Sequence, residues 1–106
     1  MTTTDEPTVI ITGYLDVPDL DRAEVLGGLA DVTARSRLDP GCIEYWWAED
    51  LDRPMRFRFY ECWESADHLA AHRAQPYEAE FVEQFVSRCR GADATVCTVT
   101  DRRAAR

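Results

Sequence analysis

One histidine and a group of aromatic side chains are the residues of this sequence best suited to chemistry. His72 carries an imidazole, whose ordinary pKa of ~6.5 makes it a base near neutral pH. The aromatic side chains of Tyr45, Trp63 and Tyr77 can line a narrow pocket for a flat molecule, and each bears a hydrogen-bond donor. A base beside a dry aromatic slot is what proton abstraction from a phenolic substrate requires.

Each of these residues also has a structural interpretation. His72 also fits a hydrogen-bonded histidine at a junction between a helix and a sheet. Glu61 shares a strand face with Trp63, and it either receives a proton or anchors a backbone or histidine N–H, of which we favour the anchor. The aromatic residues suit a hydrophobic core as well as a pocket, so both interpretations stay open.

Metal and disulfide chemistry have weaker signals. His68 and His72 are four residues apart on a predicted helix, the spacing at which two histidines can share a metal, but we expect His68 to face water and expect no metal. The four cysteines form no C-x-x-C pair, which argues against a zinc site. Cys42 and Cys62 are expected to be neighbouring free thiols.

The elements that must position these residues follow from hydrophobic spacing and turn residues. Asp19 and Asp21 are candidate N-caps of the first helix, with Asp21 and Glu24 spaced as in a capping box, and Ser65 is a candidate N-cap of the second. Gly91 is expected just past a helix end. The sequence predicts strands over 8–17, 42–49, 55–63 and 94–100, and helices over 20–38, 66–74 and 77–90. This order, β-α-β-β-α-β, predicts an α+β, ferredoxin-like fold, a four-stranded antiparallel sheet with helices on one face.

The two middle strands are expected to form a hairpin that turns symmetrically about Asp52, with Cys42 opposite Cys62. Alternation then divides the side chains between two faces of the sheet. One face is aromatic and comprises Ile43, Tyr45, Trp47, Phe57, Phe59, Glu61 and Trp63. The other face is amphipathic, with Trp46 expected on Arg58 and Glu44 beside an arginine. We interpret this second face as an interface with another protomer.

Composition narrows the function further. Twelve arginines, no lysines and 20 acidic residues give a net charge of −8, which disfavours binding to nucleic acid. No apolar run is long enough to span a membrane, and residues 1–8 lack the pattern of a signal peptide, so we expect a cytoplasmic protein. We expect one domain over 8–101, with tails over 1–7 and 102–106.

A set of residues in order resembles a known family. It comprises Pro40-Gly41-Cys42, Tyr45, the run Phe57 to Ser65 (FRFYECWES), Leu69, His72, Pro76 and Phe81. This set resembles the antibiotic biosynthesis monooxygenase domain, over roughly residues 8–100. The resemblance implies a dimeric α+β barrel, a homodimer in which two sheets pack face to face, and a cavity between sheet and helices in each protomer. Several oxygenases of the family need no metal, flavin or other cofactor.

The sequence departs from the family pattern at two places. Some anthrone- and heme-oxidising members use an Asn on the first strand, whereas this chain has no Asn and Thr12 is the nearest polar substitute. Many members have a histidine after the proline of the second helical segment, where this chain has Tyr77.

The resemblance and the residues together lead to one expected function and one alternative. We expect a cofactor-independent monooxygenase that oxidises a small aromatic quinol or polyketide-like phenol with O₂. His72 would be the base, and Trp63, Tyr45, Tyr77, Phe59 and Trp47 would bind the substrate. The alternative is a dimer of the same fold that binds a small molecule without turnover.

Overall fold

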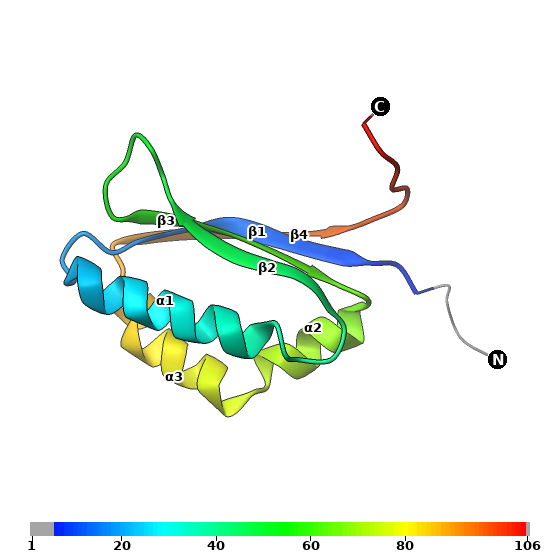
Figure 1. Cartoon of the computed structure of the whole chain (residues 1–106), viewed down its shortest axis with the longest axis horizontal. Coiled ribbons are helices and arrows are strands. Elements are labelled where there is room, and N and C mark those ends of the chain that lie inside the picture. The colour runs from blue at the N-terminus through cyan, green and yellow to red at the C-terminus, as the bar shows by residue number, and fades with distance from the viewer. Residues whose placement is uncertain (1–5, 106) are drawn as a thin grey trace.

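The computed structural model describes residues 6–105, so most of the expected N-terminal tail and Arg106 lie outside the described residues. One four-stranded sheet lies against three α-helices that all cover the same face (Figure 1). The elements in chain order are β1 (Val9–Asp16), α1 (Arg22–Ser36), β2 (Cys42–Glu49), β3 (Arg56–Trp63), α2 (Ala66–Arg73), α3 (Pro76–Gln84), the short 3₁₀-helix η1 (Val86–Arg88) and β4 (Gly91–Thr98). The predicted ferredoxin-like α+β fold is confirmed.

The strand order across the sheet is β2-β3-β1-β4, and every neighbouring pair is antiparallel. The two sequence-adjacent strands β2 and β3 form the hairpin, while β1 lies in the interior between β3 and β4. In the hairpin, the start of β2 lies beside the end of β3, and α2 follows β3 directly in the chain. Among residues 6–105, no helix is long and apolar enough to cross a membrane.

Of the candidate N-caps, Asp21 and Ser65 cap helices and Asp19 does not, so α1 begins at Arg22 instead of Leu20. The Asp21 carboxylate accepts a hydrogen bond from the Glu24 backbone N–H, and the Ser65 hydroxyl accepts one from the His68 backbone N–H. Each bond satisfies a backbone donor that the first helical turn leaves without a partner. Helix α3 has Pro76 in its first turn, where the missing N–H costs nothing.

The predicted end of the last helix is wrong. Helix α3 ends at Gln84 instead of Arg90, and Gly91 begins β4 instead of capping a helix. The reason is strand pairing with β1, since the Arg90 N–H donates to the Asp16 carbonyl at 2.9 Å and Gly91 pairs with Asp16. Pairing therefore extends β4 backwards beyond its predicted start.

The predicted hairpin register is also wrong, although its division into faces largely holds. Trp47 pairs with Phe59 and Tyr45 with Glu61, so the turn is centred one residue later than Asp52. The turn includes Met55 at a positive φ of 65°, which the residue types did not reveal. Moving the centre by one residue shifts the pairing by two, and side chains alternate with a period of two, so the faces survive.

A β-bulge between Cys42 and Glu44 changes the start of the hairpin. Cys42 pairs with Trp63 instead of Cys62, and it packs against the core. Ile43 is consequently exposed rather than part of the aromatic face. The expected Cys42–Cys62 neighbours are thus on different pairs of the ladder, and both cysteines are free thiols.

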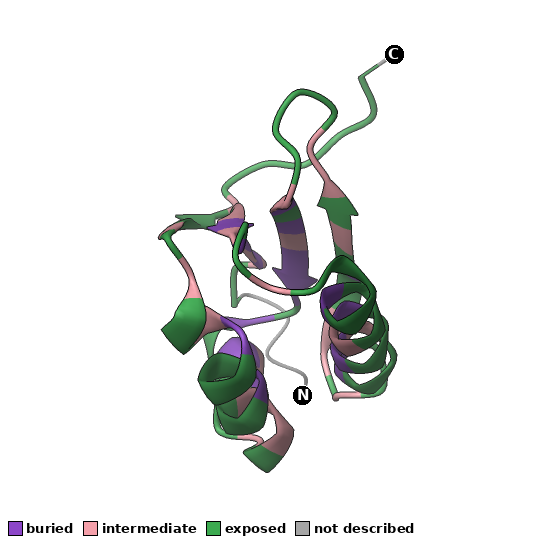
Figure 2. Cartoon of the chain, turned by 90° about the vertical axis from the view of Figure 1, so that its left-hand side faces the viewer, coloured by how far each residue is buried: buried purple, intermediate pink, exposed green. Residues whose placement is uncertain are grey.

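The core lies between the sheet and the helices, where Figure 2 shows the buried positions on the surfaces that face one another. Val25, Leu29 and Val32 on α1 are buried at helical spacing, and Phe57, Phe59 and Trp63 are buried on β3. Burying each of these side chains contributes about 1.5–3 kcal/mol. The aromatic face is therefore partly core.

The opposite face of the sheet has no helix over it (Figure 1). Trp46 stacks on Tyr60 with ring centroids 5.7 Å apart, and its indole N–H donates to Glu44 at 3.0 Å. Arg58 pairs instead with Asp50 at 2.7 Å, so the predicted contacts of Arg58 with Trp46 and of Glu44 with an arginine are wrong. Asp50 lies in the longer turn and reaches Arg58 from there.

Candidate active site

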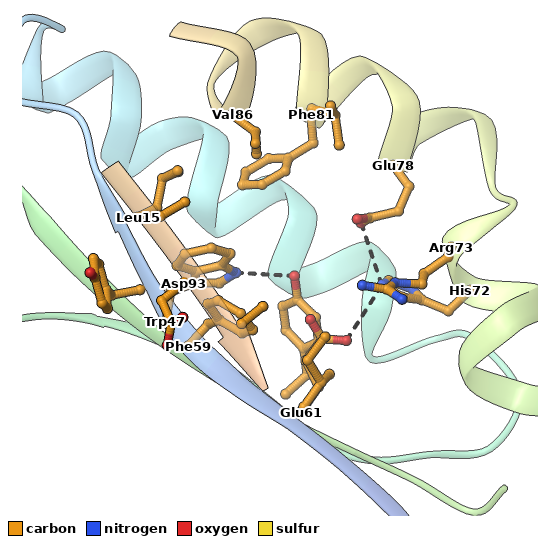
Figure 3. A pocket seen from close by; sticks show the side chains of 16 residues that line it. Leu15, Trp47, Phe59, Glu61, His72, Arg73, Glu78, Phe81, Val86 and Asp93 are labelled. Carbon is orange, nitrogen blue, oxygen red and sulfur yellow. Dashed lines mark hydrogen bonds and ion pairs between the residues drawn. The ribbon is translucent and has the colours of Figure 1, made fainter. Parts of the chain in front are cut away.

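A cavity of about 290 Å³ lies between the sheet and the helices (Figure 3). Most of its wall is apolar, with Ile11 and Leu15 from β1 and Phe81 from α3. One end is polar, and there His72, Glu61, Glu78 and Arg73 come together. The remaining lining residues are Tyr14, Tyr45, Trp47, Phe59, Val82, Val86 and Ala92 to Ala94.

His72 lies near the end of α2 and is only 2% exposed. Its ring stacks on Trp63, with centroids 4.5 Å apart and an angle of 29° between the planes. Trp63 is completely buried, so the surrounding core holds its ring in place against the imidazole. The ring orientation of His72 is therefore set by packing before any hydrogen bond is considered.

One ring nitrogen of His72 is held by Asp39, in the turn after α1. The distance from Nδ1 to Asp39 Oδ2 is 2.9 Å. Asp39 also accepts from the Tyr77 hydroxyl on Oδ2 and from the Gln75 amide at 3.0 Å on Oδ1. Burial and the hydrogen bond to Asp39 raise the pKa of Tyr77, so its hydroxyl keeps its proton and donates it.

The other ring nitrogen faces the cavity and two carboxyl groups (Figure 3). His72 Nε2 lies 3.4 Å from Glu78 Oε2 and 3.7 Å from Glu61 Oε1. Burial raises the pKa of both glutamates, and the indole N–H of Trp63, which donates to Glu61 Oε1 at 3.0 Å, partly opposes the shift at Glu61. Glu78 Oε2 is buried and has no hydrogen-bond partner.

The aromatic wall is tied together beside this polar end. The Trp47 indole N–H donates to the Tyr45 hydroxyl at 3.0 Å, and Trp47 packs on Phe59 and Phe81 with centroids 4.9 and 5.6 Å apart. Burial raises the pKa of Tyr45, so its hydroxyl remains protonated. The wall is consequently uncharged and pre-formed, as a site for a flat apolar ligand requires.

The structure places the residues that the sequence singled out in two groups. His72, Tyr45, Trp47 and Phe59 line the cavity. Trp63 and Tyr77 are not among the lining residues, because Trp63 lies behind the imidazole and Tyr77 contacts Asp39.

Thr12 and His68 lie apart from this polar end. The Thr12 hydroxyl donates to the Phe59 carbonyl at 2.8 Å, and Thr12 is not among the lining residues. His68 is tied to the Ser65 hydroxyl at 2.8 Å and packs against Gly41. Across residues 6–105 no group of three or more side chains is arranged to hold a metal ion.

Asp39, at Nδ1 of His72, and Glu78 and Arg73 of the polar end escaped the sequence analysis as functional candidates. Asp39 looked like part of a helix stop in Asp39-Pro40-Gly41, and nothing in its neighbourhood linked it to a histidine 33 positions away. Glu78 looked like one of many acidic residues on a helix surface. The break at Gln75-Pro76 was the available signal, since a new helix direction there turns Glu78 back toward His72.

The arrangement has the properties of a general base. Asp39 accepts the hydrogen of Nδ1, which leaves Nε2 as an acceptor directed at the cavity. A proton taken up by Nε2 would create an imidazolium flanked by Asp39 on one side and by Glu61 and Glu78 on the other. The polar end can therefore remove a proton from a ligand and hold it.

The chain is similar in sequence to known proteins. The model of the antibiotic biosynthesis monooxygenase family matches residues 8–84. An uncharacterised protein of Synechocystis is 32% identical over 80 residues, which span 76% of this chain but only 54% of that protein. The chain thus corresponds to about half the length of this relative.

Solved structures share the fold. A Deinococcus radiodurans protein provisionally named an antibiotic biosynthesis monooxygenase superposes with a TM-score of 0.84 at 21% identity, covering 92% of this chain and 98% of that one. A Mycobacterium tuberculosis protein superposes with a TM-score of 0.77 at 23% identity, covering 93% and 100%. At these identities the likeness establishes the fold alone.

Proposed function

This chain belongs to the antibiotic biosynthesis monooxygenase family, and on that premise we propose that it is a cofactor-independent monooxygenase acting on a small aromatic quinol or phenol. The observation that carries the proposal is the direction of His72. Its Nδ1 is held by Asp39 and its Nε2 faces an aromatic cavity. A binding protein has no need of a base fixed in this way.

The proposed reaction starts with proton transfer. His72 Nε2 takes a proton from a substrate hydroxyl, which turns the ring into an electron-rich anion. The anion passes one electron to O₂, and the resulting radicals combine at a ring carbon. One oxygen atom stays in the product as a new carbonyl or hydroxyl and the other leaves as water. The substrate supplies all four electrons and becomes a quinone, so no further reductant is needed.

The size of the cavity supports a substrate of one or two rings. A buried cavity of about 150 Å³ suffices for benzene in another protein, and the cavity here has about 290 Å³. The apolar walls, including Phe59 and Phe81, would shield from water the faces of a bound ring that they cover. Exclusion of water strengthens the electrostatic contact between the substrate anion and protonated His72.

We also propose that the protein is a homodimer whose sheets pack through the face without helices. Trp46 and Tyr60 stack on this face, and the large indole of Trp46 is 37% exposed there. Large side chains on an uncovered sheet face mark an interaction surface. Sedimentation should give a dimer for the wild-type chain and a monomer for Trp46→Glu. A wild-type monomer at micromolar concentration would contradict this assembly.

The decisive experiment is O₂ consumption by metal-stripped protein with a panel of hydroquinones, catechols and anthrones. We expect uptake above the rate of autoxidation, and we expect His72→Ala to abolish it with the fold intact by circular dichroism. His68→Ala, on the same helix but away from the cavity's polar end, is the matched control and should keep the activity. Binding of the aromatics without O₂ uptake would instead support the small-molecule-binding alternative.

A further inference from the structure

We propose that Glu78 and His72 together recognise two hydroxyl groups on neighbouring ring carbons, so that the cavity selects catechol-type aromatics. The inference rests on the proposed function, because it names the substrate class of the same cavity. It assigns Glu78 a role in substrate binding in addition to the base, His72.

The first observation is a pair of adjacent acceptors at the polar end. Glu78 Oε2 is buried and has no hydrogen-bond partner, and it lies 3.4 Å from His72 Nε2. In the neutral imidazole Nε2 is an acceptor, because the Asp39 carboxylate can only accept and Nδ1 therefore bears the hydrogen. A buried acceptor left without a donor is destabilising, so a ligand that brings the donor should bind about tenfold or more tightly than one that does not.

The second observation is the number of donors that these two acceptors need. One hydroxyl has one proton and can satisfy only one of them. Two hydroxyls on neighbouring carbons point the same way from the ring and reach both atoms. In hydroquinone the hydroxyls leave opposite sides of the ring, so only one of them can reach this pair of acceptors.

Glu61 is less available to the ligand. Its Oε1 already accepts from the Trp63 indole N–H at 3.0 Å, and it lies 3.7 Å from His72 Nε2. Glu61 and Glu78 both accept hydrogen bonds when ionised, and a carboxylate on the ligand would then face two like charges against one cation, Arg73. The polar end therefore favours neutral hydroxyls over carboxylate groups.

The test is a calorimetric titration under anaerobic conditions, where binding is measured without turnover. The ligands are catechol, hydroquinone, guaiacol (the monomethyl ether of catechol) and salicylate, in which a carboxylate replaces one hydroxyl. We expect catechol to bind about tenfold or more tightly than hydroquinone and guaiacol, and salicylate to bind most weakly. Equal affinity for catechol and guaiacol, or no binding of catechol at millimolar concentration, would overturn the inference.

Variants then assign the preference to Glu78. Glu78→Leu should lower the affinity for catechol about tenfold while leaving the affinity for guaiacol unchanged or higher. Glu83→Leu, on the exposed side of the same helix, is the matched control and should behave like the wild type. Glu78→Gln keeps a carbonyl acceptor and should retain part of the preference. A full preference in Glu78→Leu would contradict the assignment even if the wild type prefers catechol.

The two proposals fail separately. Anaerobic preference for catechol without O₂ consumption would leave the recognition of neighbouring hydroxyls standing and remove the oxygenase. O₂ consumption that is equally fast with hydroquinone and catechol, together with equal binding, would keep the oxygenase and remove the role of Glu78 in selection.

Discussion

The two nitrogens of His72 lie in contrasting surroundings. Nδ1 contacts a network in which Asp39 accepts from the imidazole, Tyr77 and Gln75. Nε2 faces Glu61 and Glu78, and a buried oxygen of Glu78 has no hydrogen-bond partner. One side of the imidazole is thus closed by the fold, while the other is left for a ligand.

This difference separates stability from recognition. Satisfied buried networks rigidify a structure, whereas an unsatisfied buried acceptor destabilises it unless a ligand supplies the donor. The Asp39 side fixes where the imidazole points, and the Glu78 side supplies the unmet hydrogen bond. Substitutions on the two sides should therefore change different measured quantities.

The largest effect is expected from Asp39→Asn. An amide can donate to Nδ1, which favours the tautomer with hydrogen on Nε2 and removes the base from the cavity. We expect turnover to fall about 100- to 10,000-fold with little change in KM. Nitrogen NMR of the imidazole should show the changed tautomer directly. Asp31→Asn, on the exposed surface of α1, is the matched control. Unchanged turnover in a variant with the changed tautomer would contradict a base at Nε2.

Substitutions at two neighbouring glycines of α1 test how α1 packs against α3, the helix that contributes Phe81 to the cavity wall. A methyl group at Gly28 would overlap the ring of Phe85, which is buried and packs on Phe81 of the cavity wall with centroids 5.4 Å apart. We expect Gly28→Ala to lower the free energy of unfolding by about 1–3 kcal/mol.

Gly27→Ala is the control for the glycine pair. Nothing lies within 4 Å of a methyl group at Gly27, so the variant should gain up to about 1 kcal/mol from helix propensity. Urea denaturation measures both changes. Equal stability of the two variants would show that Phe85 can move to make room for the methyl group, so that this packing is not rigid.

A smaller effect is expected from Tyr77→Phe, which removes one donor from Asp39 and keeps the ring. We expect a loss of about 1 kcal/mol in the free energy of unfolding and an unchanged affinity for catechol. Chemical denaturation and anaerobic calorimetry measure the two quantities. A marked loss of catechol affinity would instead put the Tyr77 hydroxyl in contact with the substrate.

The smallest effect is expected in the pH dependence of the free energy of unfolding, to which the buried carboxyl of Glu78 contributes. Burial raises the pKa of Glu78, so the folded state holds this proton more strongly than the unfolded state does. The contribution of Glu78 to stability is therefore full below the ordinary Glu pKa of ~4.3 and is lost as the pH rises through the raised value. His72, Glu61, Arg73 and Asp39 surround this carboxyl and act on its charge.

Glu78→Gln removes that titration and should flatten the decline in stability above about pH 4. Denaturation series at several pH values compare this variant with the wild type and with Glu83→Gln, which should follow the wild-type curve. Parallel curves for Glu78→Gln and the wild type would mean that Glu78 titrates normally in the folded protein.

Local signals in the sequence predicted much of the fold. The side chains of Asp21 and Ser65, two of the three candidate caps, do cap helices, because a cap acts on backbone donors only three residues away. The alternation in β2 and β3 placed Tyr45, Trp47 and Phe59 on the inner face. The register of that hairpin was not predictable from alternation, since it depends on a turn in which Met55 adopts a left-handed conformation.

The sequence by itself determined the order of the α-helices and β-strands, most of the inner face of the sheet and the candidacy of His72 as a base. Only the tertiary structure decided which nitrogen of His72 is held and which faces the cavity. That choice depends on Asp39 and Glu78, which reach the imidazole from the turn after α1 and from α3. Local spacing carries no information about such contacts, because they arise when separate elements pack against one sheet.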